Sequence, residues 1–372
     1  MNDDGYRHGG HVWEEALDLG MPPAEILDFS ANMNPFGPPA TVVSCLREAI
    51  DDLRHYPDPS NHGLVRAISE FQGIDGASIV PANGGAEAIF ALPPALEISS
   101  GVCCAPTFTG YAESLEAWKK PVVSVPHRFG PGEGRFRRAI EEATRKAAPG
   151  SAVYICNPNN PTGEIIEREF LTWAWRRITG AGAVLVVDEA FMDFVTLPHE
   201  QVSMLKDAAQ CPRLVVLRSM TKFYSIAGLR LGYCVTVPPD AERIQRLLPP
   251  WSVNRLAQVA GVAALEDTEF VKTAARVALV REKLSADLGA TRLFRVFPSV
   301  ANYLLLEILA DAWDGPRLAR ETRKRGILIR DCSNISGLDR SFVRVAVRLP
   351  HENERLVALT RQIIGGRDDD VE

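Results

Sequence analysis

The sequence lacks the features that mark several classes of protein. None of its apolar runs approaches the roughly 20 residues needed to cross a bilayer, and residues 1–10 do not form a secretory signal. The seven cysteines include no C-x-x-C pair and no regular spacing, which excludes a disulfide framework and a zinc site. The net charge is -6 and the basic residues are scattered, so neither nucleic acid nor a membrane is expected as a partner. We expect a cytoplasmic protein.

Short apolar runs alternate with helical patterns through the first two thirds of the chain. The chain has 372 residues, 46% of them hydrophobic and 24% charged, as in globular proteins large enough for two domains. Several runs are apolar throughout, which is typical of strands covered by helices on both faces. A helix is predicted over 166–180, ending on a glycine. The predicted strands are 78–83, 101–106, 122–126, 152–158, 183–190, 214–220 and 231–237. This alternation predicts an α/β domain.

The pattern changes near residue 240. It is helical up to about residue 288, and strand-like runs then return at 300–308 and 341–347 with helices between and after them. This second pattern predicts a smaller α+β domain. We therefore expect four parts: an N-terminal arm (1–35) that joins the small domain and the substrate site, a large domain (36–240), connecting helices (241–288) and a small C-terminal domain (289–372).

Lys222 lies in an unusual setting. Residues 219–233 read SMTKFYSIAGLRLGY, which places this lysine among small, hydroxyl and apolar residues directly after the apolar run 214–220. A buried lysine is costly unless it has a partner or a covalent role. Arg230 follows eight residues later in the same stretch. We interpret Lys222 as a residue that the chemistry of the protein requires.

Three further strand ends carry candidate binding groups. The segment NGGAEAIF (83–90) leads through two glycines into a helix, whose N-terminus suits a phosphate. The segment CNPNNPTGEI places Asn157 at the carboxyl end of a strand, where ligands bind in open α/β sheets. Asp188 ends an apolar run and needs a cation or strong donors if it is buried. Each has a structural alternative, namely a glycine turn, a rigid Asn-Pro turn and a helix cap, and the neighbouring Glu189 is either a structural partner or solvated.

Taken together, these residues are the parts needed to hold pyridoxal 5′-phosphate. Lys222 would form a Schiff base with the aldehyde of the cofactor. Asp188 would pair with the protonated pyridine nitrogen and so keep the ring an electron sink. Ser219 and Arg230 would bind the cofactor phosphate, together with the backbone N–H groups at the start of the helix, which belong to Gly84, Gly85 and Ala86.

These motifs resemble those of the aspartate-aminotransferase superfamily, the fold type I enzymes that depend on pyridoxal phosphate. Residues 219–233 match its S-x-[ST]-K…G-[LI]-R signature. The resemblance implies a large domain with a mostly parallel seven-stranded sheet flanked by helices, plus a smaller α+β C-terminal domain.

Within this superfamily the sequence is similar to histidinol-phosphate aminotransferases and, over nearly its whole length, to the threonine-phosphate decarboxylases of cobalamin biosynthesis. Phe191 stands where the aminotransferases usually have tyrosine, and residues 27–39 depart from their usual pattern, so both positions favour the decarboxylases. The stretches that carry the similarity are 8–10, 27–39, 56–68, 188–194, 217–233, 250–254, 301–306, 327–334 and 342–348.

The resemblance also implies roles for single residues. Asn157 would donate to the ring hydroxyl of the cofactor and contact the substrate, and Phe108 would stack on the ring. Tyr56 matches a tyrosine that reaches the cofactor phosphate of the neighbouring subunit, which implies a homodimer with shared active sites. The other positions that match substrate-binding residues are His8, Gly9, Asn32, Arg330 and Arg344. Taken alone, His8 would read as a solvated histidine and Arg344 as a solvent-facing strand residue.

The implied reaction is decarboxylation of L-threonine O-3-phosphate to (R)-1-aminopropan-2-ol O-2-phosphate and carbon dioxide. Three alternatives remain open from the sequence. The first is an aminotransferase acting on histidinol phosphate or a similar compound, and the second is a decarboxylase that prefers L-serine O-phosphate. The third is a non-catalytic protein on the same scaffold, against which the intact Lys222, Asp188 and Arg230 argue.

Overall fold

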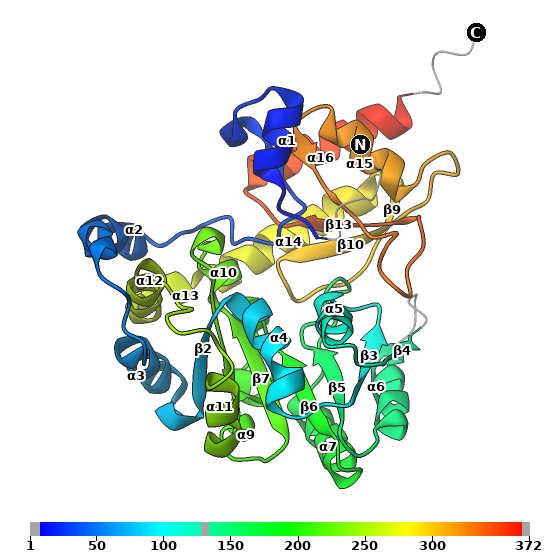
Figure 1. Ribbon diagram of the computed structural model, residues 1–372. Helices are drawn as coiled ribbons and strands as arrows, with labels where there is room; N and C mark the ends of the chain where they lie inside the picture. The colour runs from blue at the N-terminus through cyan, green and yellow to red at the C-terminus, as the bar shows by residue number, and fades with distance from the viewer. Residues whose placement is uncertain (1–7, 128–133, 367–372) are drawn as a thin grey trace.

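A seven-stranded sheet forms the centre of the larger part of the molecule. The computed structural model describes residues 8–127 and 134–366. The strand order is β2-β8-β7-β6-β5-β3-β4, and Figure 1 shows helices packed around this sheet. The strands are β2 (Ile79–Asn83), β3 (Ser100–Ala105), β4 (Val122–Pro126), β5 (Ser151–Cys156), β6 (Val184–Asp188), β7 (Leu214–Ser219) and β8 (Leu231–Val235). All seven predicted strands are confirmed, with ends that differ by two residues at most.

The sheet is parallel except for β8. This strand pairs antiparallel with both β2 and β7, whereas β7, β6, β5, β3 and β4 pair with one another in parallel. Every residue of β5, β6 and β7 is buried, because helices cover both faces of the sheet. This explains why these strands read as continuous apolar runs in the sequence.

Alternate side chains of the central strands enter two separate hydrophobic cores. On one face, Leu185 and Val187 of β6 pack in a core that also contains residues of α3, α6 and α7. On the other face, Val184 and Val186 pack with residues of α4, α5 and α11. Successive side chains of a strand point to opposite faces of the sheet, and this alternation produces the two cores. The two cores fix the sheet, and therefore the position of its strand ends.

The helices alternate with the strands through the first two thirds of the chain and then dominate between residues 238 and 290. The predicted helix over 166–180 is α7, which begins two residues later and ends at Gly180. No helix within residues 8–127 and 134–366 is long and apolar enough to span a bilayer. The helices are α1 (Val12–Leu19), α2 (Ala40–Glu48), α3 (His62–Gln72), α4 (Gly84–Ala95), α5 (Gly110–Ala117), α6 (Arg135–Lys146), α7 (Arg168–Gly180), α8 (His199–Val202), α9 (Leu205–Ala208), α10 (Met220–Phe223), α11 (Pro238–Gln245), α12 (Arg255–Glu266), α13 (Thr268–Val271), α14 (Thr273–Ala290), α15 (Gly315–Arg323) and α16 (Pro350–Thr360).

A smaller antiparallel sheet follows α14. Its strands are β9 (Phe294–Val296), β10 (Tyr303–Ile308), β12 (Arg330–Asp331) and β13 (Phe342–Ala346), in the order β12-β13-β10-β9. This confirms the predicted smaller α+β domain, while the boundaries at residues 35, 240 and 288 stay predictions.

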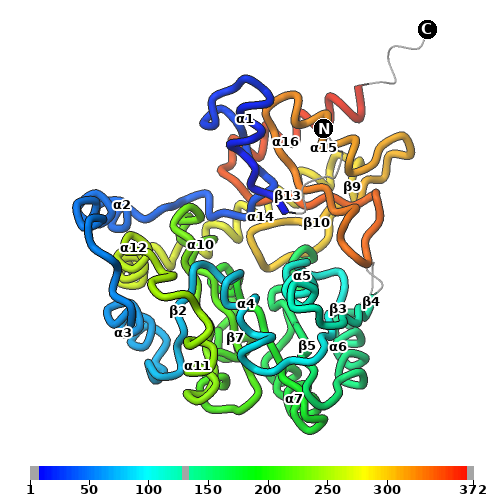
Figure 2. Tube along the Cα trace, viewed as in Figure 1, coloured from blue at the N-terminus to red at the C-terminus, as the bar shows by residue number. Residues whose placement is uncertain are grey.

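The N-terminal arm packs on this smaller part. Strand β1 (Leu27–Asp28) pairs in parallel with β11 (Ile327–Leu328), and the tube in Figure 2 shows α1 above the strands of the small sheet. Glu15 of α1 also pairs with Arg323 of α15. The arm therefore brings residues 8–10 and 30–34 toward the place where the two sheets meet.

Candidate active site

The predicted binding groups gather at one edge of the large sheet. Strands β2, β5, β6 and β7 run in the same direction, so their carboxyl ends meet at the same edge. Gly84 follows β2, Asp188 ends β6 and Ser219 ends β7. Antiparallel β8 begins at this edge, directly after Arg230. Figure 1 shows the small sheet above this edge, so the site lies between the two parts of the molecule.

Lys222 lies in the short helix α10, directly after β7. Its Nζ lies 3.5 Å from Ser219 Oγ and 5.1 Å from the centre of the Phe191 ring. Burial lowers the pKa of Lys222, and the charge of Arg230 adds to this effect while that of Asp188 opposes it. A lowered pKa increases the neutral fraction of the amine, which is the form that attacks an aldehyde. The surroundings of Lys222 therefore suit a covalent role.

Asp188 is a buried carboxylate that is held by hydrogen bonds. Its Oδ2 accepts a bond of 2.6 Å from the Tyr111 hydroxyl, and its Oδ1 accepts one of 2.9 Å from the Ala190 N–H. Burial raises the pKa of Asp188, whereas the bond from Tyr111 and the charge of Lys222 lower it. The described residues offer it no ion pair with an arginine or a lysine. A protonated ring nitrogen would supply the missing cation.

The N-terminus of α4 and Arg230 form a cradle for an anion. The first N–H groups of a helix have no partners within it, and here they belong to Gly84, Gly85 and Ala86. The Arg230 guanidinium lies so close that a Cβ added to Gly84 would be 2.6 Å from its Nη2. A Cβ on Gly232 would come within 2.6 Å of the Gly85 backbone nitrogen, so this glycine lets β8 approach the helix start. The Arg230 guanidinium and the N-terminus of α4 therefore lie close together, which is the arrangement that binds a phosphate.

The environment of Asn157 contradicts its predicted role. Its side chain donates to the Ile166 carbonyl at 3.1 Å and to the Val202 carbonyl at 3.0 Å, and its Oδ1 accepts from the Ile166 N–H at 2.8 Å. Both amide hydrogens are therefore used within the protein, and the residue is fully buried. Asn157 fixes the turn after β5 and has no hydrogen left to donate to a cofactor hydroxyl or a substrate.

Asn160, three residues later in the same turn, is the better candidate. It is only partly buried, and its Oδ1 accepts a bond of 2.5 Å from Arg344 Nη1. It therefore lies beside Arg344, a predicted substrate residue, at the edge of the sheet that carries Asp188. We propose that Asn160, rather than Asn157, has the ligand-binding role.

Arg330 and Arg344 lie directly opposite each other on paired strands. Residue 330 of β12 is the register partner of residue 344 of β13, an arrangement in which like charges normally destabilise a sheet. Arg330 donates to Asn334 Oδ1 at 2.8 Å, and Arg344 donates to the Ser30 carbonyl at 2.7 Å. Within the described chain Arg344 forms no ion pair with a carboxylate, its Nε has no partner, and burial lowers its pKa to about 10. Two buried cations side by side favour a bound anion.

Three residues of the N-terminal arm, His8, Gly9 and Asn32, are predicted to bind the substrate. The ring of His8 lies 5.5 Å from that of Phe108, and its Nε2 lies 3.3 Å from Glu113 Oε2. Asn32 is buried and its Oδ1 has no hydrogen-bond partner in the described part of the chain. Gly9 contacts Ser30, whose carbonyl oxygen would be only 2.2 Å from an added Cβ. Gly9 therefore lets the arm approach residue 30, while Asn32 keeps a free acceptor.

Tyr56 lies apart from these groups on the surface of the chain. Its side chain is 80% exposed and stacks on Trp251 with ring centres 4.7 Å apart. Its predicted role belongs to the site of a second subunit, so it stays a prediction.

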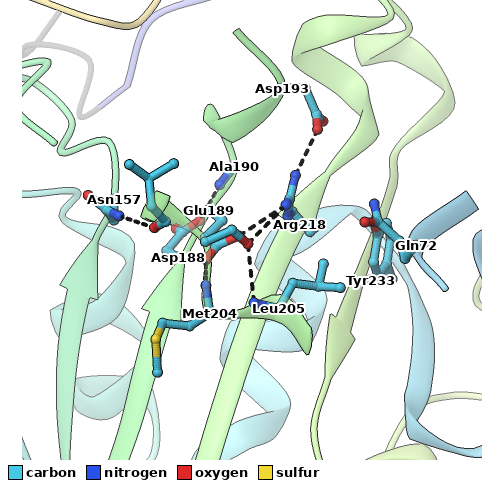
Figure 3. A network of polar contacts seen from close by, with 12 residues as sticks. Gln72, Asn157, Asp188, Glu189, Ala190, Asp193, Met204, Leu205, Arg218 and Tyr233 are labelled. Atoms are coloured by element: carbon cyan, nitrogen blue, oxygen red, sulfur yellow. Dashed lines mark hydrogen bonds and ion pairs between the residues drawn. The ribbon is translucent and has the colours of Figure 1, made fainter. Parts of the chain in front are cut away.

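Behind the site, an ion-pair network joins the ends of β6 and β7 (Figure 3). Glu189 is fully buried and pairs with Arg218 Nη2 at 3.1 Å, while Asp193 pairs with Arg218 Nη1 at 2.7 Å. Glu189 also accepts bonds from the Ser203 hydroxyl and the Met204 N–H. It is therefore the structural partner that one interpretation of the sequence proposed. Because Glu189 follows Asp188 and Arg218 precedes Ser219, the network stabilises the strand ends that carry the site.

The comparisons with known proteins agree with this geometry. Residues 24–359 match the family model for class I and II aminotransferases. The chain belongs to this family. Its members are enzymes that use pyridoxal 5′-phosphate, and this is the cofactor of the present enzyme.

Both groups named by the sequence resemblance are found among the relatives of this class I and II enzyme. It is 37% identical to a threonine-phosphate decarboxylase of Salmonella typhimurium, over 96% of this chain and 97% of the relative. It is 30% identical to a histidinol-phosphate aminotransferase of Methanocaldococcus jannaschii, over 96% and 95% of the two chains. The crystal structure of the histidinol-phosphate aminotransferase from Clostridium acetobutylicum is similar with a TM-score of 0.80 and 26% identity, covering 92% of this chain and all of the other.

We expect borohydride treatment of the cofactor-loaded enzyme to attach the cofactor to Lys222. Peptide mapping by mass spectrometry identifies the modified lysine, and Lys222→Ala should carry no label and lose turnover. Lys206, which lies outside the site, supplies the matched control as Lys206→Ala and should label like the parent. A label on another lysine in the parent enzyme would contradict the assignment.

We expect Asn157→Ala and Asn160→Ala to fail in different ways. The first leaves buried backbone groups without partners, at about 1–3 kcal/mol for each such group, so it should lower the Tm. The second removes only a partly buried contact to Arg344, so it should keep a Tm near the parental value and lose at least roughly tenfold in kcat/KM. Calorimetry measures the Tm of both variants, and steady-state kinetics measure their kcat/KM. Parental kcat/KM in Asn160→Ala would show that Asn160 has no role in ligand binding.

Proposed function

We propose that the enzyme decarboxylates L-threonine O-3-phosphate to (R)-1-aminopropan-2-ol O-2-phosphate, the linker to the nucleotide loop of cobalamin. The observation that carries this proposal is the buried pair Arg330 and Arg344, which lie opposite each other at the site. Their planar, doubly donating heads suit a phosphate. The 37% identity to a threonine-phosphate decarboxylase over nearly the full length of both chains supports the same substrate.

The substrate phosphate gives the enzyme a handle far from the bond that breaks. In our proposal Arg330 and Arg344 grip this phosphate, with His8 and Asn32 beside them. A charge-assisted contact contributes on the order of 1.5–3 kcal/mol. Binding energy from a remote group can hold the reacting part of a substrate in an orientation it would not choose. The arginines therefore act on rate as well as on affinity.

The orientation of the carboxylate decides between decarboxylation and transamination. When bound, the cofactor withdraws the electron pair of the bond at Cα that stands perpendicular to its ring. A transaminase holds the substrate carboxylate in the ring plane, usually with an arginine. If the phosphate occupies the arginines here, the carboxylate is free to turn out of the plane. The bond from Cα to the carboxylate then breaks, carbon dioxide leaves, and a proton from Lys222 or from water takes its place.

The geometry of the site supports the remaining proposed roles. Asp188 is the acceptor for a protonated ring nitrogen, and its hydrogen bonds from Tyr111 and Ala190 fix the plane of its carboxylate. Ser219, Arg230 and the first residues of α4 hold the cofactor phosphate. Phe108, partly buried and in edge contact with Tyr111, supplies the ring that stacks on the cofactor.

We also infer a homodimer with shared active sites. The exposed Tyr56 and Trp251 stack on each other at the surface, where an uncovered aromatic pair is unusual unless another molecule packs there. In the proposed dimer, Tyr56 of one subunit reaches the cofactor phosphate of the other.

Transamination of histidinol phosphate is the second candidate. It is favoured by 30% identity to a histidinol-phosphate aminotransferase over nearly the whole chain. Phe191, buried next to Lys222, stands where those aminotransferases usually have tyrosine, which favours the decarboxylase. A preference for L-serine O-phosphate changes the substrate by one methyl group, which is worth only about 1–3 kcal/mol of discrimination.

Incubation with the three phosphorylated compounds in parallel tests the proposed function. Threonine phosphate should release carbon dioxide and form aminopropanol phosphate, identified by mass spectrometry, with no need for 2-oxoglutarate. Serine phosphate should react more slowly. Turnover of histidinol phosphate that depends on 2-oxoglutarate, without carbon dioxide release from threonine phosphate, would establish the aminotransferase instead.

We expect Arg330→Ala and Arg344→Ala each to lower kcat/KM for threonine phosphate by roughly ten- to a hundredfold. The reason is the loss of a charge-assisted contact that also orients the substrate, so kcat should fall along with affinity. Unphosphorylated threonine should be a very poor substrate of the parent, and the two variants should lose little further activity toward it.

Arg340→Ala is the matched control, because Arg340 is exposed and pairs with Asp314 at the surface. It should keep parental kinetics. The absorption spectrum of the bound cofactor should be nearly unchanged in all three variants, since other residues hold the cofactor. Full kcat/KM in both Arg330→Ala and Arg344→Ala would show that the phosphate binds elsewhere.

A further inference from the structure

Tyr111 lies directly behind Asp188 and was not identified from the sequence. It belongs to the first turn of α5 and its side chain is fully buried. Its hydroxyl donates a short bond of 2.6 Å to Asp188 Oδ2. Because α5 follows β3 while Asp188 ends β6, the bond joins two elements that lie far apart in the sequence.

Aromatic neighbours hold the Tyr111 ring in place. It stacks on Tyr154 with ring centres 5.3 Å apart and an angle of 18° between the planes. The ring of Phe108 packs against it at 5.4 Å in an edge-on arrangement. The direction of the hydroxyl is therefore set by packing, and the same ring that contacts Asp188 also supports Phe108.

The charge balance around Asp188 makes this hydroxyl important. Groups from four elements face the carboxylate: Tyr111 from α5, Cys156 from β5, Lys222 from α10 and Tyr303 from β10. Of these, Lys222 is the one whose side chain can carry a positive charge. Burial raises the pKa of Asp188, and the bond from Tyr111 is the largest effect that opposes it. Burial and the charge of Asp188 raise the pKa of Tyr111 well above its usual value, so its hydroxyl keeps its proton and stays a donor.

We propose that Tyr111 is a positioning residue that keeps Asp188 ionised and oriented for the ring nitrogen of the cofactor. An ionised Asp188 stabilises the protonated nitrogen, whereas a neutral carboxyl group does not. The inference rests on the role proposed above for Asp188, and it does not depend on which phosphorylated substrate the enzyme uses.

Tyr111→Phe removes the hydroxyl and keeps the ring, so the variant conserves volume and should fold. Tyr154→Phe is the matched control, since it makes the same change in the stacked neighbour. In the part of the chain that the structure describes, no hydrogen bond joins the Tyr154 hydroxyl to Asp188. Both variants are compared with the parent enzyme and with Asp188→Asn.

The first measurement uses the enzyme without cofactor and follows the carbonyl stretch of a protonated carboxyl group by infrared difference spectroscopy during a pH titration. The band that disappears in Asp188→Asn belongs to Asp188. We expect this band to persist to higher pH in Tyr111→Phe than in the parent, and to be unchanged in Tyr154→Phe. An Asp188 band that titrates at the parental pH in Tyr111→Phe would overturn the inference.

The second measurement is the dissociation constant of the cofactor, obtained by absorbance titration. It should rise roughly tenfold in Tyr111→Phe, because binding of the cofactor must then also ionise and orient Asp188, and stay at the parental value in Tyr154→Phe. An unchanged constant in Tyr111→Phe overturns the inference even if Asp188→Asn is inactive. Parental activity in Asp188→Asn would instead overturn the role of Asp188 itself.

Discussion

Buried charges without matching partners are the constraint on which the site depends. An ionised side chain placed away from water is costly unless it is paired. In this chain, buried charges with an ion-pair partner and buried charges without one lie close together. Arg218 is paired with Glu189 and Asp193 behind the site, and it stabilises the fold. Among the described residues, Asp188 and Arg344 form no ion pair, and the hydrogen bonds they accept or donate leave capacity for a ligand. Strand β6 of the large sheet holds Asp188 and strand β13 of the small sheet holds Arg344. In the proposed function, the cofactor and an anionic substrate complete the charge balance.

The parts of the fold that follow from local pattern could be predicted from the sequence. Strands β5, β6 and β7 are buried on both faces, so each had to be a continuous apolar run, and each was found within two residues of its ends. Asp188 and Lys222 could be identified as candidate site residues because Asp188 ends such a run and Lys222 follows one. The cradle at Gly84 and Gly85 followed from the glycines between a strand and a helix.

Contacts between distant segments could not be predicted in the same way. Asn157 and Asn160 lie in one turn, and only the structure shows that the amide of the first is fully used within the protein. The register that places Arg330 opposite Arg344 depends on the pairing of two strands, which the local sequence does not define. Tyr111 is one aromatic residue at the start of a helix, and its bond to Asp188 appears only when α5 packs against the sheet.

The central claim is that Arg330 and Arg344 bind the phosphate of the substrate and leave its carboxylate free. A crystal structure of the cofactor-loaded Lys222→Ala variant with L-threonine O-3-phosphate tests this claim most directly, because the variant should not turn the substrate over. The account predicts phosphate oxygens within hydrogen-bond distance of Arg330 and Arg344, and a carboxylate that makes no contact with either. A carboxylate bound to Arg344, with the phosphate away from both arginines, would contradict it.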